Sequence, residues 1–117
     1  MDRETPHVER RKYPRTSLDL PVEYRVMNTP YAHGGLVVNA SEMGLLINSV
    51  KDILIGSKLN IVVLFPKGFQ LTNFEASTEI IWKDYHREEN WEGYRYGLKF
   101  IEIFDEDRRK LKQLLSG

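Results

Sequence analysis

The sequence predicts an all-β dominated domain, in which five or six antiparallel strands form a small barrel that a C-terminal α-helix covers. Apolar and polar residues alternate over residues 18–26, which is the period of a strand with one buried face. Further segments rich in β-branched or aromatic residues follow, separated by Gly, Pro, Asn or Ser. After Phe104 the spacing of leucines becomes that of an amphipathic helix.

The N-terminal residues 1–16 are predicted to form an extended or mobile arm, because they are polar, contain Pro6 and Pro14, and lack apolar periodicity. Residues 17–117 are then the barrel and its helix. Pro21 lies within the first predicted strand and cannot donate a hydrogen bond to a neighbour. We therefore expect this strand to lie at an edge or to carry a bulge.

The remaining elements follow in order. "NTPYAHGG" is predicted to be a turn, and the strand candidates after it are "LVVNAS", "GLLINS", "SKLNIVVLF", "LTNFEASTEIIWKDY" and "YRYGLKFIEI". In "DEDRRKLKQLLSG", Asp105 is the predicted N-cap, with acids in the first turn and bases further on, as the helix dipole favours. The residues expected to share one face of this helix are Phe104, Leu111, Leu114 and Leu115.

Composition excludes several classes of protein. The chain has 117 residues, 41% hydrophobic and 29% charged, with a formal net charge of zero, which argues against a general nucleic-acid-binding protein. It contains no cysteine, so disulfides and thiolate metal sites are excluded. The N-terminus lacks the apolar stretch of a secretory signal, and the longest apolar run, residues 61–65, is too short to span a bilayer. We expect a cytoplasmic protein with no membrane insertion.

Two short motifs are candidates for function. In "RRKYPR", Pro14 favours an extended chain at Tyr13, so Arg11 and Arg15 project to the same side, at most roughly 13 Å apart at about 3.3 Å per residue. Their guanidinium groups could converge on a phosphate or on the O6 and N7 acceptors of guanine. The alternative is a solvated charged arm.

The second motif is "NASEMG", residues 39–44, between two strand candidates. Asn39 and Ser41 can shape a turn by bonding nearby backbone, and Gly44 can adopt positive φ or allow another group to approach the backbone closely. The functional alternative is that the amide and the hydroxyl, held at the end of a strand, offer donors and acceptors to the edge of a base.

Together, "RKYPR" and "NASEMG" resemble the PilZ family, whose pattern is RxxxR followed by [D/N]xSxxG. The resemblance covers nearly the whole chain, including "YGLKF" and the final helix. It implies a six-stranded antiparallel β-barrel with a C-terminal helix that binds the bacterial second messenger cyclic di-GMP and signals to a downstream protein that the sequence does not identify.

The resemblance also assigns residues to the ligand site. Arg11 and Arg15 match the arginines that grip guanine and phosphate, and Asn39, Ser41 and Gly44 match the residues that hold the ligand on the barrel. Gly97 falls where the family often has a glycine beside the site. In the family, the position of Arg10 is associated with whether one ligand or an intercalated pair binds. Because Arg10 adds a cation and a flat stacking surface, we expect two ligands per chain.

The sequence gives less support to other functions. His7, His33 and His86 lack the spacing of a metal site, and no G-x-S-x-G elbow is present, so we expect neither an enzyme nor a metal or cofactor. The aromatic residues near the C-terminus either form a stacking platform for single-stranded nucleic acid or fill the core and brace a hairpin: Trp82, Tyr85, Trp91, Tyr94, Tyr96 and Phe100. The main alternative is a PilZ-like module that binds a protein and no nucleotide.

Overall fold

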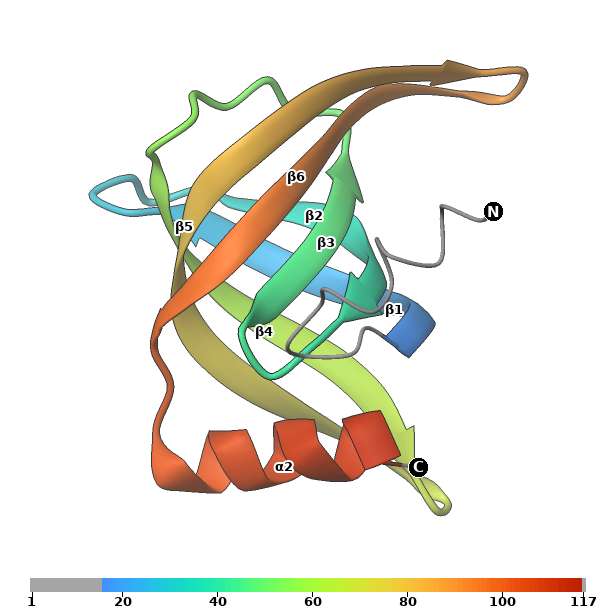
Figure 1. Ribbon diagram of the computed structural model, residues 1–117, viewed down its shortest axis with the longest axis vertical. Coiled ribbons are helices and arrows are strands. Elements are labelled where there is room, and N and C mark those ends of the chain that lie inside the picture. Colours follow the sequence, from blue (N-terminus) through green and yellow to red (C-terminus); the bar gives the residue numbers. More distant parts are fainter. Residues whose placement is uncertain (1–15, 117) are drawn as a thin grey trace, which may run out of the picture.

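The computed structural model describes residues 16–116, which fold into a closed six-stranded barrel and a helix (Figure 1). The elements are β1 (Thr16–Val26), β2 (Ala32–Ala40), β3 (Gly44–Ser49), β4 (Lys58–Lys67), β5 (Gln70–Glu88), β6 (Trp91–Glu102) and α2 (Asp105–Ser116). The strand order is β1-β2-β3-β6-β5-β4, β4 pairs back with β1, and every neighbouring pair is antiparallel. The predicted fold class is therefore confirmed.

The alternation predicted for the first strand is present in β1. Val22 and Tyr24 are buried, whereas Glu23 and Arg25 are exposed. β1 pairs with both β2 and β4, so the prediction of an edge strand is wrong. The predicted bulge is present instead, because the register with β2 shifts just before Pro21. Pairing with β4 starts only at Val22, so the missing N–H of Pro21 costs no hydrogen bond on that side.

The predicted turn "NTPYAHGG" is shorter than expected, because β2 already begins at Ala32. The turn itself is closed by a bond from Thr29 N to Val26 O of 3.0 Å, and Asn28 has a φ of 70°. Gly35 belongs to the strand for a packing reason. A Cβ at this position would lie 2.7 Å from the carbonyl oxygen of Asn48, so the glycine allows β2 and β3 to approach.

The interior of the barrel contains the inward-facing side chains of all six strands. The largest fully buried side chains are Tyr24, Tyr96, Phe74, Leu45, Ile47, Leu59, Ile61, Ile80 and Leu111. The buried hydroxyl groups have partners, as buried polar groups require. The hydroxyls of Tyr24 and Ser49 are 2.6 Å apart, and Thr78 donates to the carbonyl of Leu59 at 3.1 Å.

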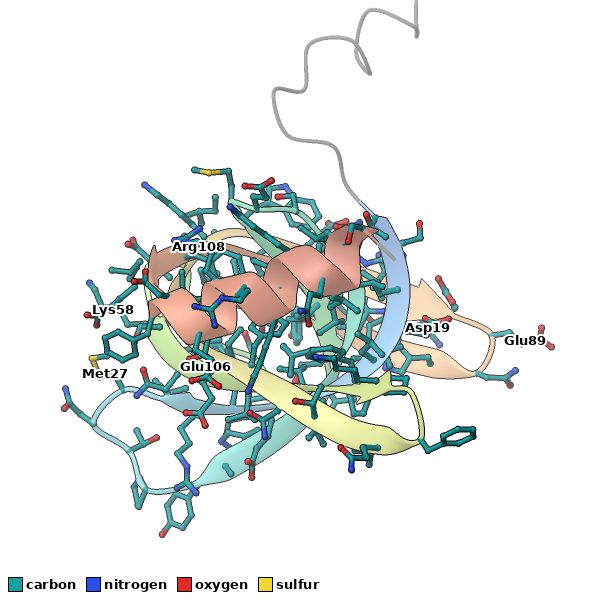
Figure 2. All side chains as sticks on the ribbon, turned by 90° about the horizontal axis from the view of Figure 1, so that it is seen from below. Asp19, Met27, Lys58, Glu89, Glu106 and Arg108 are labelled. Carbon is teal, nitrogen blue, oxygen red and sulfur yellow. The ribbon has the colours of Figure 1, made fainter. Side chains whose placement is uncertain are left out.

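The helix α2 lies across one end of the barrel, as Figure 2 shows. Leu111 is fully buried, and Leu114 and Leu115 pack against the core, as predicted. Phe104 does not share this face and is 69% exposed. Its carbonyl accepts the first helical bond, from Arg108 N at 2.9 Å, so Phe104 is the N-cap and Asp105 is the first helical residue.

The first turn of α2 also covers an open part of β5. β5 pairs with β6 only from Ser77 onwards, which leaves the preceding N–H groups of β5 without a partner strand on that side. Asp107 Oδ1 accepts a hydrogen bond from Glu75 N at 2.9 Å. The helix thereby protects an edge that could otherwise pair with another chain.

At the opposite end, β5 and β6 extend beyond the barrel as a hairpin, and Figure 2 shows Glu89 at its far tip. No helix within residues 16–116 is both long and apolar enough to cross a membrane.

Candidate functional site

A single row of outward-facing residues crosses five strands of the barrel and contains two of the predicted site residues. Each member is the register partner of the next: Ser17 (β1), Asn39 (β2), Leu46 (β3), Gly97 (β6) and Trp82 (β5). We call this set the cross-strand row. Neighbouring strands lie about 4.8 Å apart, so Asn39 and Gly97 are about 10 Å apart with Leu46 between them.

A shallow cavity of about 370 Å³ opens over this row. Its lining residues are Asn39, Leu45, Leu46, Ile81, Trp82, Gly97 and Leu98. Most of these are apolar, and Asn39 brings an amide with both donors and an acceptor. A hollow of this kind suits a flat ring that has a polar edge, because the ring covers the apolar residues while its edge meets the amide.

Trp82 supplies the aromatic surface of the cavity, although neither sequence motif contains it. A bulge in β5 between Ile80 and Trp82 turns the indole to the outer face, opposite Gly97. A Cβ on Gly97 would lie 3.1 Å from the Cβ of Trp82 and 3.6 Å from its Cε3. Gly97 therefore leaves room for the indole, which remains 45% exposed. The sequence shows an aromatic residue in one predicted strand and a glycine in the next. It does not reveal that the two residues pair, because a bulge shifts the register between them.

The "NASEMG" turn is built by its own backbone and by the hydroxyl of Ser41. Ser41 N donates to Gly44 O at 2.9 Å, and Ser41 Oγ accepts a bond from Met43 N at 3.2 Å. Ser41 is buried, at 4% exposure. The described contacts thus give Ser41 a role in shaping the turn, and its contact with a ligand stays a prediction.

Gly44 does not adopt a positive φ. The other predicted reason for a glycine applies, because another group approaches its backbone closely. A Cβ there would lie 1.9 Å from the carbonyl oxygen of Leu98 in β6. The preceding residue is also tied to β6, since Phe100 N donates to Met43 O at 3.0 Å. The turn is thus held against the strand that carries Gly97. Ser41 and Gly44 lie beside the cavity, and neither lines it.

The three predicted arginines Arg10, Arg11 and Arg15 lie outside the described residues. The described chain begins at Thr16, and its neighbour Ser17 is the register partner of Asn39. In sequence, Arg15 is therefore only two residues from the first member of the cross-strand row.

The residues next to Gly97 and Trp82 anchor the loop between β3 and β4. Tyr96 accepts a bond from Ile53 N at 2.8 Å and donates to the carbonyl of Lys51 at 2.6 Å. Burial raises the pKa of Tyr96 above its ordinary value of 10.0. Lys83 forms an ion pair with Asp52, and this bond lowers the pKa of Asp52 and raises that of Lys83. Tyr96 and Lys83 are register partners, so these contacts brace the strands on the face opposite the cavity.

The other aromatic residues mainly serve the structure. Tyr96 is fully buried, and Phe100 packs against the core. Tyr85 and Tyr94 meet edge to face, with ring centroids 5.8 Å apart, and His86 and Trp91 meet at 6.1 Å on the hairpin. Of the six aromatic residues considered, only Trp82 is therefore available to a ligand, and the other five fill the core or brace the hairpin. Within residues 16–116, no group of acidic or histidine side chains is arranged to hold a metal ion.

Comparisons with known proteins agree with this architecture. A profile of the PilZ domain matches residues 9–117. The structure of the Bacillus subtilis inhibitor of motility (MotI/DgrA) superposes with a TM-score of 0.72 at 20% identity, covering 90% of this chain and 48% of that one. The chain thus spans about half the length of that protein.

A second solved structure, the PilZ domain of YcgR from Escherichia coli with c-di-GMP, has a TM-score of 0.72 at 14% identity. The match covers 92% of this chain and 89% of that one. No curated protein matches the sequence. Because the profile covers almost the entire chain, including both motifs, this chain belongs to the PilZ domain family.

Proposed function

We propose that this protein binds cyclic di-GMP on the cross-strand row and acts as a receptor that signals to a partner protein. The observation that carries the proposal is the position of Asn39 and Gly97 in one row, over a cavity that also contains an exposed indole. A guanine ring can lie on the apolar part of this cavity while its polar edge faces Asn39.

The arm supplies the cations in this proposal. Arg11 and Arg15 bind guanine and phosphate, since a guanidinium group can contact either one with two parallel hydrogen bonds. Ser41 and Gly44 hold the turn against β6 and so keep Asn39 in place. Arg10 provides a further charge, and a stacked pair of ligands, with four phosphates, is the expected stoichiometry.

The proposed role is binding and not catalysis. The cavity contains an amide, apolar side chains and an indole, and none of the residues that line it is a nucleophile or a general base. We expect the protein to act in the bacterial cytoplasm, where a second messenger would reach it. The downstream partner would read the surface that the ligand and the arm form together.

Isothermal titration with cyclic di-GMP tests the proposal. We expect binding, with about two ligands per chain, and a loss of about tenfold to more than a hundredfold in Arg11→Ala and Arg15→Ala. Arg25→Ala, on the far end of β1, is the matched control. Arg10→Leu should lower the ratio toward one ligand. Unchanged affinity in both arm variants would refute the assignment of the arginines.

Cyclic di-AMP distinguishes recognition of guanine from attraction to phosphate alone. Adenine presents an amino donor where guanine presents O6, and arginine cannot accept a hydrogen bond, so each base read in this way should favour guanine by about 1–3 kcal/mol. If neither nucleotide binds, the alternative of a module that binds only protein is favoured.

A further inference from the structure

Two cations of β6 lie on either side of Gly97, outside the motifs that define the family. Arg95 and Lys99 are each two residues from Gly97, so all three project from the same face of the strand. Tyr96 and Leu98, between them, are buried on the other face. The Cα atoms of Arg95 and Lys99 are about 13 Å apart, at about 3.3 Å per residue, and Gly97 of the cross-strand row lies midway between them.

Arg95 is held in a defined position. Its Nε donates to Asn48 Oδ1 at 2.8 Å, across the pair that the β3–β6 register brings together. The side chain is partly buried. This bond uses one of the five N–H donors of the guanidinium group. The bond holds the guanidinium group beside Asn48, which is two residues along β3 from Leu46.

Neither cation forms an ion pair within residues 16–116. The register places Asp84 opposite Arg95 and Glu79 opposite Lys99. Even so, the ion pairs of this part of the chain include neither cation. The guanidinium group is turned away from β5 and across to β3. Lys99 is exposed beside Gly44, its partner in β3. Two positive charges without an ion pair among residues 16–116 thus flank the cavity on a strand, where the scaffold fixes their spacing.

We propose that Arg95 and Lys99 form a second anion site, which binds a phosphodiester of a ligand seated over Leu46 and Gly97. This inference rests on the proposed function and adds to it. In the proposed function the arm supplies cations, and β6 supplies further cations from the barrel itself. A cyclic dinucleotide carries two phosphodiesters and a stacked pair carries four, so β6 can hold one that the arm does not. Arg95 fixes orientation through its planar donors, and Lys99 adds a mobile charge.

The experiment compares two doubly substituted full-length chains that have lost the same charge. Arg95→Gln with Lys99→Gln removes the proposed site, and Arg25→Gln with Lys58→Gln is the control. Arg25, on β1, donates to the carbonyl of Pro30, and Lys58 lies at the start of β4, next to Met27 in Figure 2. In titrations with cyclic di-GMP, the first variant should bind at least about tenfold more weakly than wild type. The control should change by less than about twofold to threefold.

A second probe separates this inference from the proposed function. The ¹⁵N-labelled wild-type chain and both variants are titrated with inorganic pyrophosphate and followed by NMR. Shifts of the amides of residues 95–99 that disappear only in the β6 variant support the anion site, even if cyclic di-GMP does not bind. Cyclic di-GMP binding that is equally strong in the β6 variant and the control would overturn it while the function stands. No response to either probe in the wild-type chain would overturn both.

Discussion

Gly44 and Leu98 approach each other so closely that no side chain fits between them. A Cβ on Gly44 would lie 1.9 Å from the carbonyl oxygen of Leu98 and 3.0 Å from its carbonyl carbon. Both of these atoms are backbone, so no rotamer change can relieve the contact. The last residue of the "NASEMG" motif is therefore fixed by the packing of β3 against β6, whatever its role toward a ligand.

Gly44→Ala should destabilise the fold by at least about 2 kcal/mol, because β3 would have to move away from β6. Gly34→Ala is the control, since no atom lies within 4 Å of its added Cβ, and it should stay within about 0.5 kcal/mol of wild type. Urea denaturation measures both. Equal stability of the two variants would contradict the close approach.

Trp82→Ala should weaken cyclic di-GMP binding by about 1–3 kcal/mol, as expected for loss of a stacked base. The fold should change little, because the indole is 45% exposed. In a Trp91→Phe background, the remaining fluorescence comes from Trp82 and should respond to ligand. Trp91→Phe alone should bind as wild type does, since Trp91 packs against His86 on the hairpin. A ligand that binds without altering Trp82 emission would place the base elsewhere.

Asp107→Ala should cost about 0.5–1.5 kcal/mol of stability, because Glu75 N loses its acceptor. Glu106→Ala is a close control: it removes the same charge from the same helical turn, so its interaction with the helix dipole is similar. Glu106 is exposed and lies 4.0 Å from Lys110, a pair that contributes at most a few tenths of a kcal/mol. Thermal denaturation should therefore rank Asp107→Ala well below Glu106→Ala; equal midpoints would show that Asp107 does not protect β5.

The sequence predicted the structure best where the spacing of apolar residues alone determines which side chains are buried. Alternation predicted which side chains of β1 are buried, and the leucine spacing predicted the buried face of α2. Phe104 was misplaced because it fits the same spacing, but it is the N-cap, and a cap lies outside the regular helix. The start of β2 was missed because Gly34 and Gly35 suggest a turn, although Gly35 serves close packing.

The candidate site was predictable only in part, since its assembly depends on register. The motifs selected Asn39 and the family pattern selected Gly97, but no local pattern reveals that Leu46 lies between them. Trp82 was weighed only as one of many aromatics, because the bulge at residue 81 shifts the pairing by one residue, and each such shift reverses the face of a side chain. Arg95 was missed because its partner, Asn48, is distant in sequence.

Two buried tyrosines predict how stability depends on alkaline pH. Burial raises the pKa of Tyr24 and that of Tyr96 above 10.0, the value expected in the unfolded chain. A raised folded-state pKa means that the folded protein keeps its proton longer than the unfolded chain does. The stabilisation is therefore fully present below about pH 9 and is lost as the pH rises above about 10 towards the folded-state values. Urea midpoints measured from pH 8 to 11 should fall over that interval.

Tyr96→Phe separates this titration from the hydrogen bonds of the same hydroxyl. At pH 8 the variant should be less stable by about 1–3 kcal/mol, because Ile53 N and the carbonyl of Lys51 lose their partner. Between pH 9 and 11 its stability should fall less steeply than that of wild type, because one titrating group has been removed. Tyr31→Phe, at a position 71% exposed, should match wild type at pH 8. If Tyr96→Phe loses stability with pH as steeply as wild type does, Tyr96 is not a source of the alkaline transition, and the burial of its hydroxyl has no measurable cost for ionisation.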